Sequence, residues 1–324
     1  HHFDAWGQSF ATDGAGGEGI NYVFPGAVFV ASPGEPRRLM GLNPGSPKHC
    51  GLEILSGRHL PQSWRGTMVA NDFRANRVCR FEVTEDKSGY RSKQVEELIK
   101  SSHQAFRPID VKMGPDGAIY IADWYNPIIQ HGEVDFRDER RDHVHGRIWR
   151  ITAKDRPLVK PVDVATMGVD DLLESLTLPE QWVRLNAKLQ LKEHDRNEVI
   201  GKTLKWALQR DTSVATGAHE LLEALWVLQC VDHVDVSLIE QLLDNSDHRI
   251  RAATVRVVSH QRTRLPQYRR YLSAAVRDQH ARVRLEAVRA LSNENDLAAV
   301  SEISSVLEYP MDRFLDFASW RALR

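Results

Sequence analysis

FRPIDVKMGPDGAIYIADW, which runs from Phe106 to Trp124, determines the fold of the first half of the chain. At its centre, Gly114 to Gly117 reads Gly-Pro-Asp-Gly, a strong turn signal because proline presets φ and glycine accepts a positive φ. Apolar residues alternate before this turn, and β-branched and aromatic residues follow it. We therefore predict a β-hairpin centred on the turn.

Further strands are predicted on both sides of this hairpin. They are CGLEILSG (Cys50 to Gly57), GTMVANDF (Gly66 to Phe73), NRVCRFEV (Asn76 to Val83), YRSKQVEELI (Tyr90 to Ile99) and GRIWRIT (Gly146 to Thr152). Groups of about four short strands per ~50 residues are typical of β-propeller blades, and a generic antiparallel sandwich is the alternative. A propeller has about 4–8 blades and this region has room for about three, so we predict a partial β-propeller.

The composition of the chain changes near residue 155. Seventeen of the 20 glycines precede Asp155, so the first part is rich in turns and the second is not. The segment RPLVKPVDV, from Arg156 to Val164, contains two prolines and no clear period, which is typical of a linker. The predicted organisation is a first domain at 1–155, a linker at 156–165 and a second domain at 166–324.

The second part is predicted to be an array of helical repeats. Its amphipathic segments are WVRLNAKLQL (Trp182 to Leu191), HELLEALWVL (His219 to Leu228), RIRAATVRVV (Arg249 to Val258), RVRLEAVRAL (Arg282 to Leu291) and RFLDFASWRAL (Arg313 to Leu323). Arg184, Arg251 and Arg284 share one position in this pattern, and we expect them to bond neighbouring turns or acidic side chains. One such unit cannot bury its apolar face alone, so we predict a HEAT-like α-solenoid and a multidomain β plus α protein.

The composition excludes several classes of protein. The 324 residues carry a net charge of -1, which gives no overall field to steer the chain onto nucleic acid. No apolar run reaches the roughly 18 residues needed for a transmembrane helix. The three cysteines form no CxxC pair, so we expect neither a zinc ribbon nor a c-type haem attachment in this chain.

Polar residues next to the predicted strands are candidates for a functional site. His49 directly precedes a strand that would line the central channel of a propeller, where a histidine can act as a general base. A histidine that bonds one blade to the next is the alternative. The candidates for cofactor binding, some of which also suit turns, are Arg58, His59, Asn71, Asp72, Arg107, Asp110, Asp123 and Trp124.

A long loop at 126–146 mixes histidines, carboxylates and arginines. Loops longer than about 12–15 residues are usually functional or disordered. Histidine with carboxylate can bind a transition metal, and carboxylates with backbone carbonyls can bind calcium. The candidate metal ligands are His131, Glu133, Asp135, His143 and His145. Arg137, Arg140 and Arg141 lie among them, so a loop of ion pairs is the alternative.

Four stretches of the first part resemble a family of large secreted planctomycete proteins, the membrane-bound dehydrogenase type. They are KHCGLEILSGRHLP, NDFRANRV, the stretch from Phe106 to Asp138 and RDHVHGRIWRIT. The resemblance covers roughly residues 1–155, and the repeats match only in kind. In that family, a propeller similar to the soluble glucose and sorbosone dehydrogenases precedes HEAT-like repeats and a c-type cytochrome module with a CxxCH motif. These 324 residues do not include that module.

The resemblance implies a function and a location. The sugar dehydrogenases use pyrroloquinoline quinone with calcium, and a histidine that takes the proton from the substrate alcohol; His49 matches that role best. We therefore expect an extracytoplasmic dehydrogenase that oxidises a sugar or related alcohol and passes electrons to a cytochrome, whose haem c would lie on the missing module. The alternative is a non-catalytic scaffold that binds a polysaccharide, or a protein partner on the concave face of the repeats.

Overall fold

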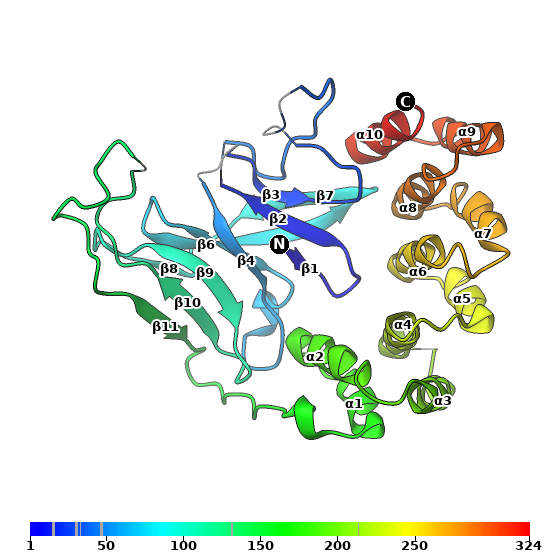
Figure 1. The fold of residues 1–324 in the computed structure, drawn as a ribbon, viewed down its shortest axis with the longest axis horizontal. Helices are drawn as coiled ribbons and strands as arrows, with labels where there is room; N and C mark the ends of the chain where they lie inside the picture. The colour runs from blue at the N-terminus through cyan, green and yellow to red at the C-terminus, as the bar shows by residue number, and fades with distance from the viewer. Residues whose placement is uncertain (15–16, 30–31, 33, 46–47, 131, 213) are drawn as a thin grey trace. The chain divides into compact units, whose positions relative to one another are not determined.

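The computed structural model describes residues 1–324 except 15–16, 30–31, 33, 46–47, 131 and 213 (Figure 1). The chain divides into two compact units. The first, here called the β-unit, comprises His1–Phe24, Val28–Glu85 and Tyr90–Pro161. The second, here called the helical unit, comprises Pro25–Ala27, Asp86–Gly89 and Val162–Arg324. The protein is therefore of mixed β plus α class.

The strands of the β-unit form three antiparallel sheets. The first contains β1 (His2–Phe3), β2 (Ser9–Asp13) and β3 (Gly19–Tyr22). The second runs β4 (Cys50–Ile54), β5 (Met68–Asp72), β6 (Arg77–Asp86) and β7 (Gly89–Gln94), with β8 (Ile99–Lys100) paired to β6. The third runs β9 (Pro108–Met113), β10 (Ile119–Asp123) and β11 (Arg147–Ile151), and a 3-10 turn, η1, covers Gln62–Trp64.

The predicted hairpin is confirmed. Strands β9 and β10 pair in antiparallel register, and Gly117 N–H donates to the carbonyl of Gly114 across the turn at 2.9 Å. Gly117 has a φ of +78°, a conformation that glycine adopts without steric cost. The alternation seen in the sequence places Val111, Ile119 and Ile121 on one face of this sheet, where all three are fully buried.

The apolar faces of the second and third sheets share a core. Val69 and Val78 from the second sheet belong to the same buried cluster as Val111, Ile119 and Ile121 from the third. Strand β4 contacts β9 and also β1 and β2, so the three sheets follow one another in a curled series around their first strands (Figure 1). This half-barrel arrangement is compatible with the partial propeller that the strand grouping predicts.

The helical unit contains ten α-helices among its described residues. They are α1 (Val169–Ser175), α2 (Gln181–Leu191), α3 (Arg196–Ala207), α4 (Ala215–Cys230), α5 (Val236–Leu243), α6 (His248–His260), α7 (Tyr268–Ala275), α8 (Ala281–Leu291), α9 (Leu297–Ser304) and α10 (Arg313–Ala322). Two 3-10 turns, η2 (Val164–Thr166) and η3 (Ser305–Glu308), accompany them. The five segments predicted from the sequence correspond to α2, α4, α6, α8 and α10.

The helices pack in series in two rows (Figure 1). Each even-numbered helix from α2 to α10 contacts the next even-numbered one, and the odd-numbered helices pack against their even-numbered neighbours. Many of the helices begin at an aspartate whose side chain accepts a hydrogen bond from a backbone N–H that lacks a partner within the helix. These N-cap aspartates are Asp195, Asp235, Asp247, Asp296 and Asp312.

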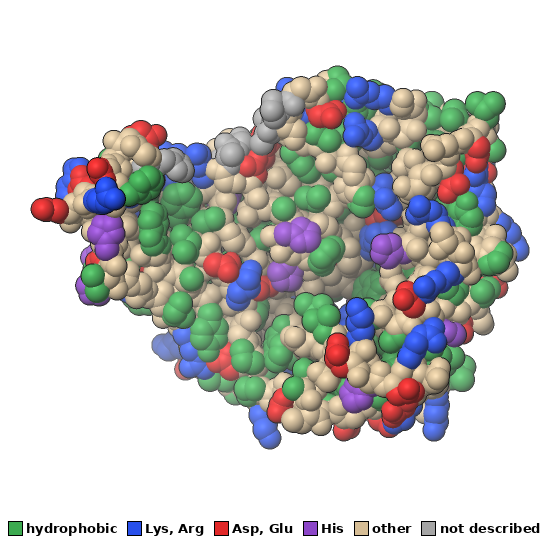
Figure 2. All heavy atoms as spheres, in the orientation of Figure 1, with side chains coloured by type: hydrophobic (Ala, Val, Ile, Leu, Met, Phe, Trp, Pro, Cys, Tyr) green, Lys and Arg blue, Asp and Glu red, His purple; other side chains and the backbone are tan. Residues whose placement is uncertain are grey.

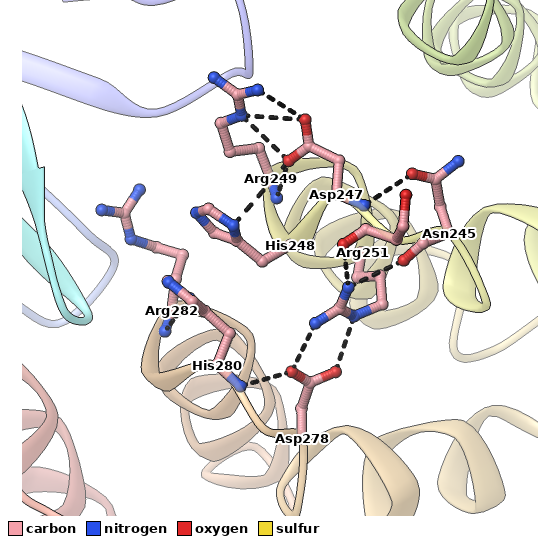
Figure 3. Close-up of polar contacts among 9 residues, drawn as sticks. Asn245, Asp247, His248, Arg249, Arg251, Asp278, His280 and Arg282 are labelled. Carbon is pink, nitrogen blue, oxygen red and sulfur yellow. Dashed lines mark hydrogen bonds and ion pairs between the residues drawn. The ribbon is translucent and has the colours of Figure 1, made fainter. Parts of the chain in front are cut away.

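The arginines at the shared repeat position link the helices, as expected. Arg184, Arg251 and Arg284 each donate from Nη1 to the carbonyl six residues earlier, at 2.7–2.8 Å. Arg251 also forms a two-point ion pair with Asp278, with both N···O distances at 2.8 Å (Figure 3). Arg184 pairs with Glu223 at 3.0 Å, whereas Arg284 lies over the ring of Tyr309. Each arginine therefore closes the turn before its helix and reaches a neighbouring element.

The turn at Asp86–Gly89, between β6 and β7, belongs to the helical unit. Arg282 is 1% exposed and donates to the carbonyls of Ser88 and Gly89, both at 2.6 Å. Asp312 accepts hydrogen bonds from the Ser88 hydroxyl at 2.6 Å and the Ser88 N–H at 3.1 Å. The ring of Phe314 lies so close to Gly89 that a Cβ there would come within 2.0 Å of it. The unit thus encloses a turn that is distant in sequence.

Among the described residues, no helix is both long and apolar enough to cross a membrane.

Candidate functional site

His49 lies immediately before β4 and is 1% exposed. Its ring meets the edge of Phe81 at a centroid distance of 5.4 Å. Neither ring nitrogen has a hydrogen-bond partner among the residues that the structure describes. Burial lowers the pKa of His49, against the opposing effects of Asp72 and the Asn71 backbone, so the imidazole is neutral near pH 7.

Asn71 on β5 is a second buried polar residue close to His49 along the register. Cys50 pairs with Asn71 across β4 and β5, so Asn71 shares the face of Cys50, whereas the His49 ring lies against Phe81 on the opposite face. The side-chain oxygen and nitrogen of Asn71 are buried and also lack partners in the described part of the chain. Unpaired buried polar groups are costly and rare in folded proteins, so each of these side chains is a candidate to bind a polar ligand on its own face.

A β-bulge at Gly51 shapes the backbone beside Asn71. The register of β4 and β5 shifts between Cys50 and Leu52, and Gly51 has a φ of +63°. A Cβ at Gly51 would lie 2.7 Å from the Asn71 amide nitrogen and 3.0 Å from Asp110 Oδ1. The glycine therefore brings Asn71 and Asp110, from two different sheets, next to each other. Among the predicted residues, Asn71 and Asp110 come together at this bulge, and Asp72 is close enough to His49 to affect the pKa of its ring.

The two carboxylates, Asp72 and Asp110, differ in availability. Asp72 is fully buried, and its oxygens accept from Arg77 Nε at 2.9 Å and from the Ala75 N–H at 3.2 Å. It therefore holds the turn after β5, which was the alternative interpretation of its sequence. Asp110 is half-exposed, and its nearest cation is Lys112 at 3.3 Å.

Arg107 and Asp123 form a separate structural centre. Buried Arg107 donates to the backbone carbonyls of Phe73, Arg74, Asn126 and Pro127 at 2.9–3.3 Å. Buried Asp123 accepts from the N–H groups of Arg107 and Tyr125 and from the side chains of Arg147 and Trp149, at 2.7–3.0 Å. Burial alone would raise the pKa of Asp123, but these hydrogen bonds outweigh it and hold the pKa below the usual range. Both groups are fully engaged in holding loops, which leaves them little capacity for a cofactor.

His59, predicted to bind a cofactor, uses both ring nitrogens in hydrogen bonds to the backbone. Its Nε2 accepts from the Ala153 N–H and its Nδ1 donates to the Pro157 carbonyl, both at 2.9 Å. Both ring nitrogens are thus used to hold the segment after β11 against the second sheet. Arg58 is exposed, and its carbonyl accepts from Arg156 in the same contact.

The predicted metal ligands do not gather in the described part of the loop at 126–146. Glu133, Asp135, His143 and His145 are all exposed, and His131 lies outside the described residues. No group of three or more histidine, cysteine or acidic side chains suited to a metal ion occurs among the described residues. The loop contains ion pairs, which was the alternative to a metal site. Asp138 pairs with Arg140 at 2.7 Å, and Asp142 pairs with His145 at 2.9 Å.

Sequence reasoning missed Tyr125, Arg147 and Trp149 as members of the Asp123 centre. Tyr125 has a φ of +53°, which is strained for a bulky residue and typical of functional sites. The exposed aromatic and basic pattern of β11, Arg-Ile-Trp-Arg-Ile, was the available signal. On the face shown in Figure 2, acidic and basic side chains are interspersed over the surface.

Parts of the chain are similar to one protein family and to a solved structure. The family model described as a domain of unknown function, DUF7133, matches residues 37–155. A crystal structure of an oxidoreductase (glucose dehydrogenase) from Thermus thermophilus is similar at 21% identity, with a TM-score of 0.32. That match covers 45% of this chain and 40% of the other, so it spans less than half of that protein. No curated protein matches the chain.

Proposed function

We propose that this protein is part of a dehydrogenase that oxidises a sugar or related alcohol, with His49 as the general base. The observation that carries the proposal is the buried imidazole of His49, whose ring nitrogens have no partner among the described residues. A substrate hydroxyl would supply a hydrogen bond that this ring lacks. The resemblance of the β-unit sequence to the sugar dehydrogenases supports the choice of reaction.

The roles of the residues follow from their protonation and placement. The neutral imidazole of His49 accepts the hydroxyl proton, while the carbon of the alcohol loses a hydride and becomes a carbonyl. Buried Asp72 stabilises the imidazolium that results, because its charge favours the protonated ring.

The resemblance implies pyrroloquinoline quinone and calcium, and the residues present fit these groups unequally. The N–H of the unpaired His49 ring fits one carbonyl oxygen of a quinone, which when bound would supply the two-electron acceptor for the hydride. Asp72 and Asp123 do not fit calcium, because each is held by an arginine, and no cluster of three or more histidine, cysteine or acidic side chains suited to a metal ion occurs among the described residues. We therefore derive no step through calcium.

The wider setting is part of the same proposal. We propose that the β-unit is a partial propeller and the helical unit a HEAT-like array, from the serial order of their sheets and helices. An extracytoplasmic location and transfer of electrons to a cytochrome rest on the sequence resemblance.

The test is a dye-reduction assay on the purified protein with added quinone and calcium, against a panel of sugars and alcohols. We expect His49→Ala to lose activity by about 10²-fold or more, the usual contribution of a general base. His260→Ala, which removes an exposed histidine of α6, is the matched control and should leave the rate unchanged.

The rate of dye reduction should also fall as the pH is lowered. Because burial lowers the pKa of His49 from 6.5, the base form is complete at neutral pH and is lost only as the pH falls below that value. Activity that is absent with every substrate, or equal in His49→Ala, would contradict the proposal and favour a binding scaffold.

A further inference from the structure

A connected group of aromatic and basic side chains lies around Asp123, at the end of β10. We call it the aromatic cluster and define it as His103, Phe106, Tyr125, His145, Arg147 and Trp149. The mechanism proposed above uses none of these residues.

The rings of the aromatic cluster contact one another in sequence. Tyr125 stacks on His103 at a centroid distance of 5.8 Å and meets the edge of His145 at 5.9 Å. The guanidinium of Arg147 lies 4.1 Å from the centre of the Tyr125 ring and 5.1 Å from that of Trp149. These contacts form a continuous surface of ring faces and edges.

Asp123 holds this surface in place. Its carboxylate fixes the indole N–H of Trp149 at 2.9 Å and Nε of Arg147 at 2.7 Å. It also accepts from the Tyr125 N–H at 3.0 Å, which stabilises the positive φ of that residue. A positive φ at a non-glycine residue costs on the order of 1–3 kcal/mol and persists only where its surroundings enforce it.

Part of the aromatic cluster is open to solvent. Trp149 is 38% exposed, and its neighbour on β11, Ile148, is 72% exposed. His103 and His145 are exposed, and Trp124, which precedes Tyr125, is 39% exposed. Figure 2 shows hydrophobic, histidine and charged side chains close together where Figure 1 places the loop between β10 and β11. Exposed aromatic residues held by a buried network are characteristic of binding surfaces.

The charges of this surface are internally paired. Arg147 pairs with Asp123 at 2.7 Å, and His145 pairs with Asp142 at 2.9 Å. Hydrogen bonds from the backbone N–H groups of His145 and Val144 lower the pKa of Asp142 to about 2, so this carboxylate is ionised at neutral pH. The surface therefore presents ring faces and hydrogen-bonding groups with little net charge. One donor, Nη2 of Arg147, has no acceptor among the described residues.

We propose that the aromatic cluster binds a neutral carbohydrate. The C–H faces of a sugar ring are apolar and pack on aromatic faces, while sugar hydroxyls exchange hydrogen bonds with the histidines and Arg147 at the edge. The internal pairing of the charges favours neutral sugars over uronic acids. The inference does not depend on the reaction at His49, because it concerns binding alone.

Isothermal titration of the whole protein with glucose, xylose and mannose oligosaccharides tests the proposal, with oligogalacturonate as the acidic comparison. We expect a neutral oligosaccharide to bind, and Trp149→Ala to weaken its affinity about tenfold, the equivalent of about 1.4 kcal/mol. Trp149→Tyr, which keeps a ring in the same place, should retain most of the affinity and guards against a loss caused by unfolding.

Leu208→Ala removes an exposed apolar side chain from the helical unit and is the matched control. The proposal is overturned if no neutral oligosaccharide binds, if oligogalacturonate binds more tightly, or if folded Trp149→Ala keeps its full affinity.

Discussion

At the scale of single residues, the chain uses its histidines in two opposite ways. His59 has both ring nitrogens bonded to backbone groups, whereas His49 has neither bonded within the described residues. Their exposures are equal, at 1% each, so burial alone does not distinguish them. The hydrogen-bond partners distinguish the two histidines. A ring with both nitrogens bonded stabilises the fold, whereas a buried ring without partners is a candidate to bind a ligand.

His59→Ala should therefore lower stability. The substitution leaves the Ala153 N–H without its acceptor, which costs on the order of 1–3 kcal/mol. Urea denaturation measures this as a lower transition midpoint. The exposed His260→Ala should not shift the midpoint, and an unshifted midpoint for His59→Ala would show that this contact is not structural.

The sequence could single out His49 and Asn71 as candidates, since both are polar residues in or next to predicted strands. It could not separate His49 from His59, because the partners of His59 lie 94 and 98 residues further along the chain. Nor could the sequence show whether the candidate metal ligands gather in space. Histidines and acids close in sequence suggest a cluster, but here the acids pair with adjacent residues, as Asp138 does with Arg140.

At the scale of elements, local signals predicted the structure well. The Gly-Pro-Asp-Gly turn and the alternation around it predicted β9 and β10, and the helical period predicted α6 and α8. The odd-numbered helices were not singled out. Several of them, such as α5 and α7 with 8 residues each, are too short to show a long repeat of the pattern.

Two arginines of α6 offer a test of what joins one repeat to the next. Arg251 of α6 pairs with Asp278, which lies between α7 and α8, and both side chains are largely buried. Arg249 instead pairs with Asp247 at the start of its own helix and is partly exposed (Figure 3). Arg251→Ala leaves Asp278 without this partner and should cost about 3–5 kcal/mol. Arg249→Ala should cost about 0–1 kcal/mol.

Chemical denaturation of the two variants, followed by circular dichroism at the helical signal, gives the comparison directly. Equal losses of unfolding free energy in the two variants would show that the Arg251–Asp278 pair contributes no more to stability than the Arg249–Asp247 pair.

At the scale of the whole molecule, the two units do not follow the order of the sequence. The turn at Asp86–Gly89 lies between two strands, yet it belongs to the helical unit. No local pattern predicts this, because the contact of Ser88 with Asp312 spans 224 residues.

Two glycine substitutions in the helical unit should have opposite effects. Gly89→Ala forces a methyl group into Phe314 and should destabilise the unit by about 1–3 kcal/mol. Gly201→Ala, inside α3 with open space around its Cα, should stabilise it by about 0.5–1 kcal/mol. Hydrogen exchange of the α10 amides provides the measurement, and unchanged protection in Gly89→Ala would show that the turn is not held as described.

The buried turn also sets an order of events during synthesis. A ribosome releases the chain from its N-terminus, so the β6 and β7 strands emerge long before Arg282 and Asp312 are made. During that interval Ser88 and Gly89 have only water for their hydrogen bonds. The helical unit can be completed only when its last helix has left the ribosome, and a stalled or shortened chain would present this turn unprotected to proteases and chaperones.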